Sequence, residues 1–126
     1  MVDVHIRTRC YRTEDRACVV SAITGLFPDA EISGSTDLVG ISHSVDSFSE
    51  LLKRQRIRDA ARAVLRRGLR GDATVFRLNK QVAAVGKISF SEEEQPLGDI
   101  EVEISSINLE HLIDEIAPHT RPEVDR

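Results

Sequence analysis

The sequence feature that most constrains the fold is the alternation of apolar and polar side chains near both ends of the chain. Residues 2–10 and residues 98–104 both follow this pattern. Because successive side chains of a strand point to opposite faces of its sheet, a period of two predicts strands that are buried on one face only. In the second stretch we expect Ile100, Val102 and Ile104 to point inward. The chain is therefore expected to fold around a sheet with one buried face.

Three other segments predict helices, because their apolar residues recur at a spacing of three or four positions. They are residues 13–27, 47–67 and 108–117. The first has Thr13 as its expected N-cap, and the second begins at the capping-box pair Ser47 and Glu50. We expect the second helix to break near residues 55–57.

Further strands are predicted from apolar runs flanked by turn residues. They are residues 30–43, 73–78 and 82–90, and the last two flank an expected hairpin turn at residues 79–81. This order predicts an α+β fold, with an antiparallel or mixed sheet of about five strands and helices packed on one face. The length of 126 residues favours one domain, which we place at residues 1–120 with a short C-terminal tail at 121–126.

The charge of the chain is concentrated by segment. Residues 51–90 hold eleven Lys or Arg residues against the two acids Asp59 and Asp72, although the whole chain has a net charge of −4 and a pI of about 5.6. Residues 91–126 are acidic, with a balance of −9. A cationic middle within an acidic protein indicates a binding site for a polyanion.

The strongest candidate site is a row of arginines spaced four residues apart in this cationic middle. On a helix, neighbours in such a row lie about 6 Å apart, which is similar to the spacing of phosphates along a nucleic-acid strand. The expected hairpin would add lysines beside the row, and Lys53, Arg56 and Arg67 would extend it. The predicted nucleic-acid-binding residues are Arg54, Arg58, Arg62, Arg66, Arg70, Lys80 and Lys87.

Two other interpretations of the arginine row stay open. The row could be a solvated helix face with no partner. It could also be neutralised by acidic groups, either Glu101 and Glu103, residues 92–94, or a second subunit.

No catalytic, metal or cofactor site can be assembled from the sequence. The four histidines lie in four separate segments, and Cys10 and Cys18 are a weak signal for zinc. No clustered glycines form a nucleotide-binding loop. We therefore expect a protein that is not an enzyme and that holds no cofactor and no metal. The scarcity of aromatic residues, with one Tyr, four Phe and no Trp, argues against a base-stacking surface.

The same sequence predicts a cytoplasmic protein without a membrane partner. No apolar stretch is long enough to span a bilayer, and the first residues lack a signal-peptide pattern. The two cysteines are expected to be reduced thiols.

Several motifs spread over nearly the whole chain resemble an archaeal protein family. They are Gln55-Arg56-Ile57-Arg58-Asp59-Ala60-Ala61-Arg62, then Leu78-Asn79-Lys80-Gln81 with Ala83, Gly86 and Phe90, then Pro96-Leu97-Gly98, then Ile113-Asp114 with Ala117-Pro118 and Thr120. Their combination resembles the uncharacterised archaeal family numbered 0201, which is labelled a predicted RNA-binding family. The resemblance implies a small α+β fold similar to the large-subunit ribosomal protein that contacts 5S RNA. It also implies a protein of the archaeal cytoplasm. It implies no reaction and no catalytic residues.

These observations predict a non-catalytic RNA-binding module that contacts phosphates through a basic helix and a hairpin. Phosphate contacts carry little sequence information, so we expect weak sequence preference. The alternative is a protein-interaction or self-assembly module, such as a homodimer, that pairs the basic middle with acidic surfaces.

Overall fold

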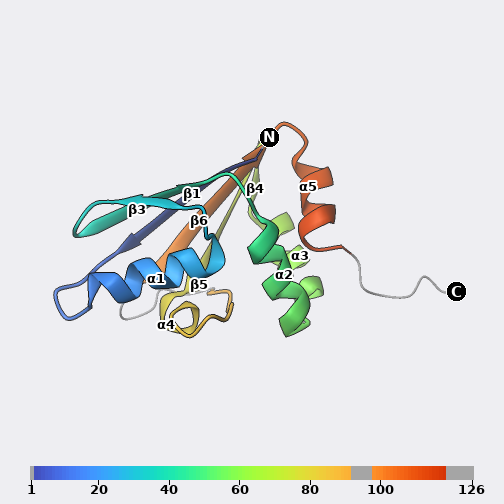
Figure 1. Cartoon of the computed structure of the whole chain (residues 1–126). Helices are drawn as coiled ribbons and strands as arrows, with labels where there is room; N and C mark the ends of the chain where they lie inside the picture. The colour runs from blue at the N-terminus through green and yellow to red at the C-terminus, as the bar shows by residue number, and fades with distance from the viewer. Residues whose placement is uncertain (1, 92–97, 119–126) are drawn as a thin grey trace, which may run out of the picture.

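The structure, a computed structural model, describes residues 2–91 and 98–118. These residues form one antiparallel sheet of six strands in the order β2-β3-β1-β6-β5-β4 (Figure 1). The strands are β1 (Val2–Arg9), β2 (Glu31–Ser33), β3 (Asp37–Ser42), β4 (Leu69–Arg70), β5 (Ala73–Asn79) and β6 (Asp99–Ser106). The two strands at the margins of the sheet, β2 and β4, are also the shortest, with three and two residues.

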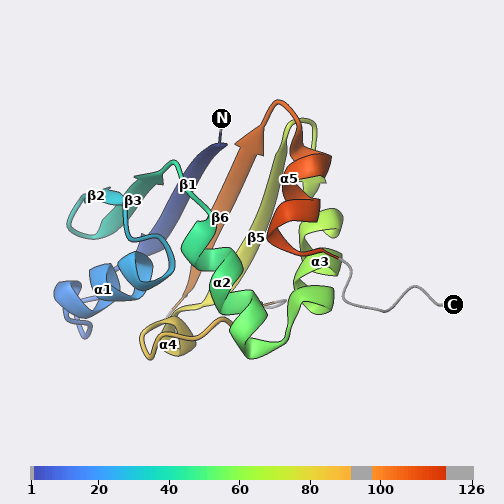
Figure 2. The ribbon, with the colours of Figure 1, turned by 45° about the vertical axis from the view of Figure 1, so that its right-hand side comes forward.

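Helices cover a single face of this sheet. They are α1 (Arg16–Leu26), α2 (Asp46–Gln55), α3 (Arg58–Arg67), α4 (Lys80–Ala83) and α5 (Leu109–Ile116). Figures 1 and 2 show all five on the same side, and in these views no helix covers the opposite face. The expected fold class, α+β with helices on one face, is therefore confirmed, although the sheet has six strands and not about five.

The two alternating segments form the centre of the sheet, as their pattern predicts. Strands β1 and β6 pair with each other, with Ile6 opposite Val102 and Val4 opposite Ile104. These four side chains and Ile100 are fully buried. Each such burial stabilises the fold by about 1.5–3 kcal/mol relative to an exposed side chain.

The core continues through aromatic rings that link helices to the sheet. Phe27 at the end of α1 stacks on Phe48 of α2, with ring centroids 5.5 Å apart. Phe48 in turn stacks on Phe76 of β5 at 5.7 Å. All three rings belong to one hydrophobic cluster, which fixes α1 and α2 relative to β5.

The helix boundaries differ from the predicted ones at two N-termini and agree at the predicted break. Asp15, and not Thr13, caps α1, because its carboxylate accepts the Ala17 N–H. Helix α2 begins at Asp46, so the expected capping box does not form. The break between α2 and α3 is confirmed, since Arg56 adopts a left-handed conformation with φ of 58° and ends α2.

Residues 30–43 form two strands and not one. Gly34 has a φ of 103°, and a Cβ at this position would lie 2.1 Å from the Asp37 carbonyl oxygen. Only glycine fits this turn, which folds β2 back onto β3.

The predicted hairpin of residues 73–78 and 82–90 is wrong in its second half. The Asn79 side chain accepts the Val82 N–H at 2.9 Å and so caps the short helix α4 instead of forming a tight turn. The chain still returns beside β5, because Asn79 N donates to Ser89 O and Ser91 N donates to Arg77 O. The predicted tail at 121–126 lies outside the described residues.

Candidate nucleic-acid interface

The predicted arginine row is divided between two elements. Helix α3 ends at Arg67, and Gly68 follows as its C-cap. Arg58, Arg62 and Arg66 therefore lie on the helix, whereas Arg70 lies on strand β4. The expected continuous row of four is wrong, because the chain turns out of the helix before its last member.

Two arginines of the row, Arg62 and Arg66, form ion pairs with helix α5. Arg62 Nη1 donates to Asp114 Oδ1 at 2.6 Å and to the Ala117 carbonyl at 3.2 Å, and its side chain is only 14% exposed. One turn further, Arg66 Nη1 lies 3.4 Å from Glu110 Oε1. The hydrogen bond from Arg62 lowers the pKa of Asp114 below its ordinary value. These contacts form the α3–α5 seam, which comprises Arg62, Arg66, Glu110 and Asp114.

Internal pairing of the row was one of the open interpretations, and the structure shows it for Arg62 and Arg66 with two acids that were not among those proposed. The carboxylate of Glu101 binds Arg7 on the neighbouring strand β1 at 2.8 Å. Residues 92–94 lie outside the described part of the chain. Asp114 and Glu110, four residues apart on α5, provide the counter-charges.

Lys80 is buried, so its predicted role as an exposed phosphate ligand is wrong. Its Nζ donates to the Arg9 carbonyl at 2.6 Å and to Glu14 Oε1 at 3.0 Å, and it lies 5.2 Å from the centre of the Tyr11 ring. The Lys80 and Glu14 side chains are 4% and 13% exposed. The ammonium therefore joins α4 to the end of β1 and to the segment that follows it.

A second group of cations lies where α2 meets α3. Gln55, the last residue of α2, donates through Nε2 to the Ile88 carbonyl at 2.9 Å and accepts the Ile88 N–H at 2.7 Å. This double hydrogen bond brings Lys87, next to Ile88, beside Arg54 and Arg56, next to Gln55. We name this surface the basic corner, and it comprises Lys53, Arg54, Arg56, Arg58 and Lys87.

The cations of the basic corner are open to solvent. All are exposed except Arg58, which is partly buried. Arg54 has a loose contact with Glu50 at 3.9 Å, and within residues 2–91 and 98–118 the other four have no ion pair. Of the predicted site residues, the structure thus brings Arg54, Arg58 and Lys87 together. Gln55, whose side chain binds the backbone of Ile88, is uncharged and was not predicted as a site residue, although it opens the first family motif.

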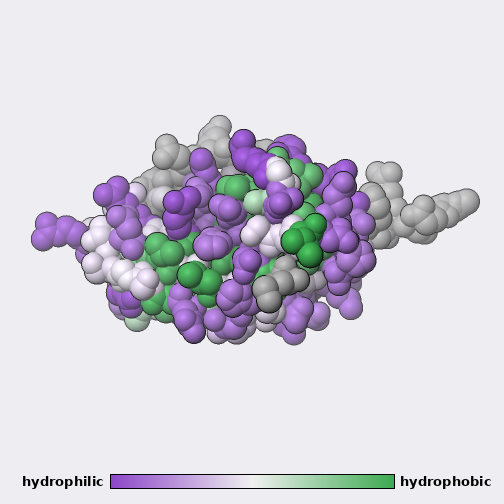
Figure 3. Space-filling model, turned by 90° about the horizontal axis from the view of Figure 1, so that it is seen from above, coloured by the Kyte–Doolittle hydropathy of each residue, from purple (hydrophilic) through white to green (hydrophobic). Residues whose placement is uncertain are grey.

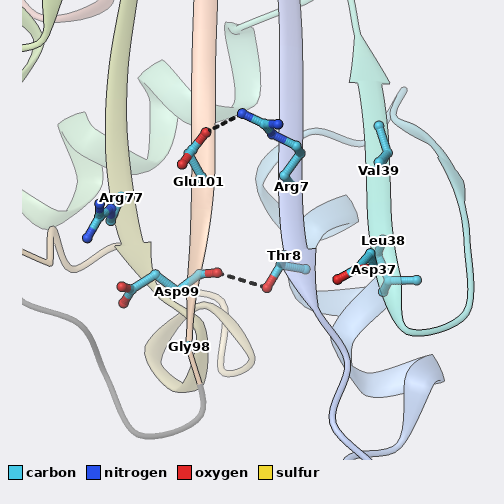
Figure 4. Close-up of a pocket in the computed structure, with 9 residues that line it drawn as sticks. All are labelled: Arg7, Thr8, Asp37, Leu38, Val39, Arg77, Gly98, Asp99 and Glu101. Carbon is cyan, nitrogen blue, oxygen red and sulfur yellow. Dashed lines mark hydrogen bonds and ion pairs between the residues drawn. The ribbon is translucent and has the colours of Figure 1, made fainter.

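The uncovered face of the sheet carries a hollow of about 490 Å³. Figure 4 shows its lining residues, which are Arg7, Thr8, Asp37, Leu38, Val39, Arg77, Gly98, Asp99 and Glu101. Both signs of charge are present, and Arg7 already binds Glu101. Figure 3 looks onto this face and shows small apolar patches between hydrophilic residues. This mixture suits a polyanion less well than the basic corner does.

The structure gives no geometry for metal binding in the part of the chain that it describes. No group of three or more His, Cys, Asp or Glu side chains there could hold a metal ion. Cys10 and Cys18 are free thiols. None of the helices in residues 2–91 and 98–118 has both the length and the apolar character needed to cross a bilayer.

The fold and the basic corner define a class of protein, namely a small α+β protein with one helix-covered sheet and a cationic end. A family model described as RNA binding matches residues 3–106 of this chain. The chain belongs to this RNA-binding family, and its archaeal relatives carry the family name UPF0201.

The similarity extends over nearly the whole chain. The chain is 40% identical over 124 residues to a UPF0200/UPF0201 protein of Archaeoglobus fulgidus, covering 95% of this chain but only 38% of that protein. It is 42% identical over 130 residues to a UPF0201 protein of Sulfurisphaera tokodaii, covering 95% of this chain and 90% of the relative. A solved UPF0201 structure from Methanococcus jannaschii superposes with a TM-score of 0.87 at 36% identity, covering 94% and 95% of the two chains.

Proposed function

We propose that this protein binds RNA without catalysis, through contacts between the basic corner and the sugar-phosphate backbone. Membership of the RNA-binding family supports this function. The observation that carries it is the pair of hydrogen bonds between Gln55 and Ile88, which unites cations from two distant segments on one exposed surface.

The contacts of this surface are to phosphate and ribose rather than to bases. Three of the four phenylalanines, Phe27, Phe48 and Phe76, are buried in the core, so they offer no platform for stacking. Arginine and lysine contacts to phosphates fix the position of a nucleic acid but carry no sequence information. The protein is therefore expected to bind many RNA sequences with similar affinity and to respond to RNA shape.

The predicted site residues take different parts in this proposal. Arg54, Arg58 and Lys87 act within the basic corner, and Arg70 contacts the same RNA from strand β4. Arg62 and Arg66 hold α5 in place, and Lys80 holds α4 in place. Lys53 and Arg56 complete the interface.

The experiment that tests this function removes two cations and measures RNA affinity over a range of salt concentrations. We expect the double variant Arg56→Gln/Lys87→Gln to bind a labelled single-stranded RNA more weakly in fluorescence anisotropy. The slope of log affinity against log salt should become shallower by about 0.7 for each phosphate that the variant no longer neutralises. The matched control is Arg12→Gln, since Arg12 is exposed on the loop before α1.

Two outcomes would contradict the proposal. In the first, the double variant and Arg12→Gln keep the affinity and the salt slope of the unaltered protein. In the second, no RNA binds and sedimentation shows a dimer that dissociates in high salt and is lost in the double variant. The second outcome would favour the self-assembly alternative.

A further inference from the structure

The margin of the sheet beside β5 contains a hollow that the basic corner does not include. Strand β4 pairs with the beginning of β5, with Arg70 opposite Ala73. Residues 89–91 pair with the end of β5, where Ser91 N donates to the Arg77 carbonyl at 3.0 Å. Between these two neighbours a cavity of about 310 Å³ opens. We name it the edge notch, and the lining residues used below are Arg67, Arg70, Arg77, Phe76, Phe90 and Ser91.

The polar side chains of the edge notch are hydrogen-bond donors. Arg67 comes from α3, Arg70 from β4 and Arg77 from β5, and no carboxylate is among the lining residues within the described parts of the chain. In those parts Arg70 and Arg77 have no ion-pair partner, whereas Arg67 takes part in an interaction of its own. The guanidinium groups of Arg70 and Arg77, which come from two neighbouring strands, indicate an anionic ligand, because each can donate two parallel hydrogen bonds to it.

Arg77 lines both the edge notch and the hollow on the open face, and the acid opposite it on β6 has another partner. Glu101 lies opposite Arg77 on β6, yet the Glu101 carboxylate binds Arg7 on the other side. Figure 4 shows the Arg77 guanidinium at the outer edge of β5, away from the Arg7–Glu101 pair. The acid directly opposite Arg77 in the register of β5 and β6 is thus paired with another arginine.

Ser91 supplies an independent observation. Its hydroxyl oxygen is buried and has no hydrogen-bond partner among the residues that the structure describes. A buried polar atom without a partner is costly, and in native proteins it needs an explanation. An oxygen atom of a ligand in the edge notch would give this hydroxyl the partner that it lacks.

We propose that the edge notch binds the terminal phosphate monoester of a nucleotide, and this inference rests on the proposed RNA-binding function. A monoester carries close to two negative charges at neutral pH, whereas each linking phosphate carries one, so the clustered arginines favour a chain end. Phe90, which is only partly buried, gives the notch an apolar side for the attached nucleoside. The cavity volume lies at the lower end of the range for small-ligand sites.

Binding of matched oligonucleotides tests the inference. One RNA sequence would be prepared with a 5′ phosphate, with a 3′ phosphate and with neither, and adenosine monophosphate would serve as the free nucleotide. We expect one phosphorylated end to raise the affinity about tenfold, as two charge-assisted contacts permit. Competition by adenosine monophosphate would identify a free nucleotide as a second source of the same group. Lack of competition would assign the notch to RNA ends.

Variants separate the edge notch from the basic corner. Arg77→Gln should remove most of the preference for a phosphorylated end and retain the affinity for unphosphorylated RNA, because Arg77 lies outside the basic corner. Arg56→Gln/Lys87→Gln should weaken both RNAs equally and keep the preference. Ser91→Ala should reduce the preference without lowering the melting temperature, because it removes a hydroxyl that has no partner within residues 2–91 and 98–118.

A titration with adenosine monophosphate tests the edge notch separately from the proposed RNA binding. If no RNA binds, the proposed function fails, and the notch is then tested by NMR shifts of the Arg70 and Arg77 side-chain N–H signals on addition of adenosine monophosphate. Equal binding of the phosphorylated and unphosphorylated RNAs, together with unshifted arginine signals, would overturn the inference. A loss of melting temperature in Ser91→Ala would show that its hydroxyl has a structural role and would also count against it.

Discussion

The α3–α5 seam and the basic corner both contain arginines from neighbouring positions of the chain. The arginines of the seam are paired with acids, whereas those of the corner are open to solvent. In the seam, Arg62 is 14% exposed and donates to a carboxylate and to a main-chain carbonyl. In the basic corner, Arg56 is exposed and within residues 2–91 and 98–118 has no ion pair. Arg58 in the corner and Arg62 in the seam are only four positions apart.

The difference teaches that an arginine row read from a sequence has no fixed role until its partners are known. Asp114 and Glu110 come from a segment about fifty positions away, and they turn two cations into structural links. The cations at the end of α2 meet a main-chain segment instead, since Gln55 binds the backbone of Ile88. Neighbouring carboxylates, and not helical position, decide which arginines stay available.

The largest effect is expected from comparing two lysines, of which Lys80 is buried and paired and Lys87 is exposed. Lys80→Ala should lower the free energy of unfolding by about 3 kcal/mol, because it leaves Glu14 largely buried without its partner. Lys87→Ala should leave stability unchanged and weaken RNA binding. Urea denaturation and fluorescence anisotropy on both variants would check this, and an equally stable Lys80→Ala variant would break the comparison.

A smaller effect is expected from the matched pair Arg62→Gln and Arg56→Gln. Arg62→Gln should lower the melting temperature, less than Lys80→Ala does, because Asp114 and the end of α5 lose their donor. Its RNA affinity should stay close to that of the unaltered protein. Arg56→Gln should show the reverse pattern. If Arg62→Gln weakens RNA binding at unchanged stability, the seam belongs to the interface.

The seam should also make stability depend on pH in the acidic range. The hydrogen bond from Arg62 lowers the pKa of Asp114 below the ordinary value of 3.8. A carboxylate with a lowered folded-state pKa stabilises the protein above that ordinary value, and this contribution is lost as pH falls further through the lowered pKa. Denaturation measured on either side of this value should show the loss. Asp114→Asn should show less of it.

Asp29 is a second group with this behaviour, away from both regions. It accepts the Ser42 hydroxyl hydrogen bond and the His43 N–H, and these contacts lower its pKa. Asp114→Asn should therefore retain part of the acid sensitivity. A variant with both carboxylates replaced by amides should retain the least.

The smallest effect is expected at the loose contact of the basic corner. Arg54 and Glu50 lie 3.9 Å apart with both side chains largely exposed. Glu50→Gln should change the free energy of unfolding by no more than about 0.5 kcal/mol, as exposed pairs do. Because it removes a negative charge beside Arg54, RNA affinity should rise slightly in anisotropy measurements at low salt. A marked loss of stability would show that this pair resembles the seam.

Local patterns predicted the parts of the fold that depend on neighbouring residues. The alternation in residues 98–104 placed Ile100, Val102 and Ile104 inward, and all three are fully buried. The break between the two middle helices was also predicted, and it lies at Arg56. Such features follow from periodicity and backbone preference, which act within a few residues.

The parts that failed depend on distant contacts. Asn79 can serve either a hairpin turn or a helix cap, and the Lys80 contacts with Glu14 and the Arg9 carbonyl favour the buried helical turn. The pairing of Arg62 with Asp114 spans 52 positions and leaves no local signal. Of the seven predicted binding residues, Lys80 is therefore misplaced, and Arg62 and Arg66 serve the seam.

The short marginal strands, β2 and β4, affect how readily other chains can pair with the edges of this sheet. A sheet with one uncovered face invites other chains to add a strand at its edge, where main-chain donors and acceptors are unpaired. Here β2 offers three residues and β4 two, so an incoming strand would gain few hydrogen bonds before running past the end of its template. The short marginal strands therefore limit how much another chain could gain by adding a strand at either margin.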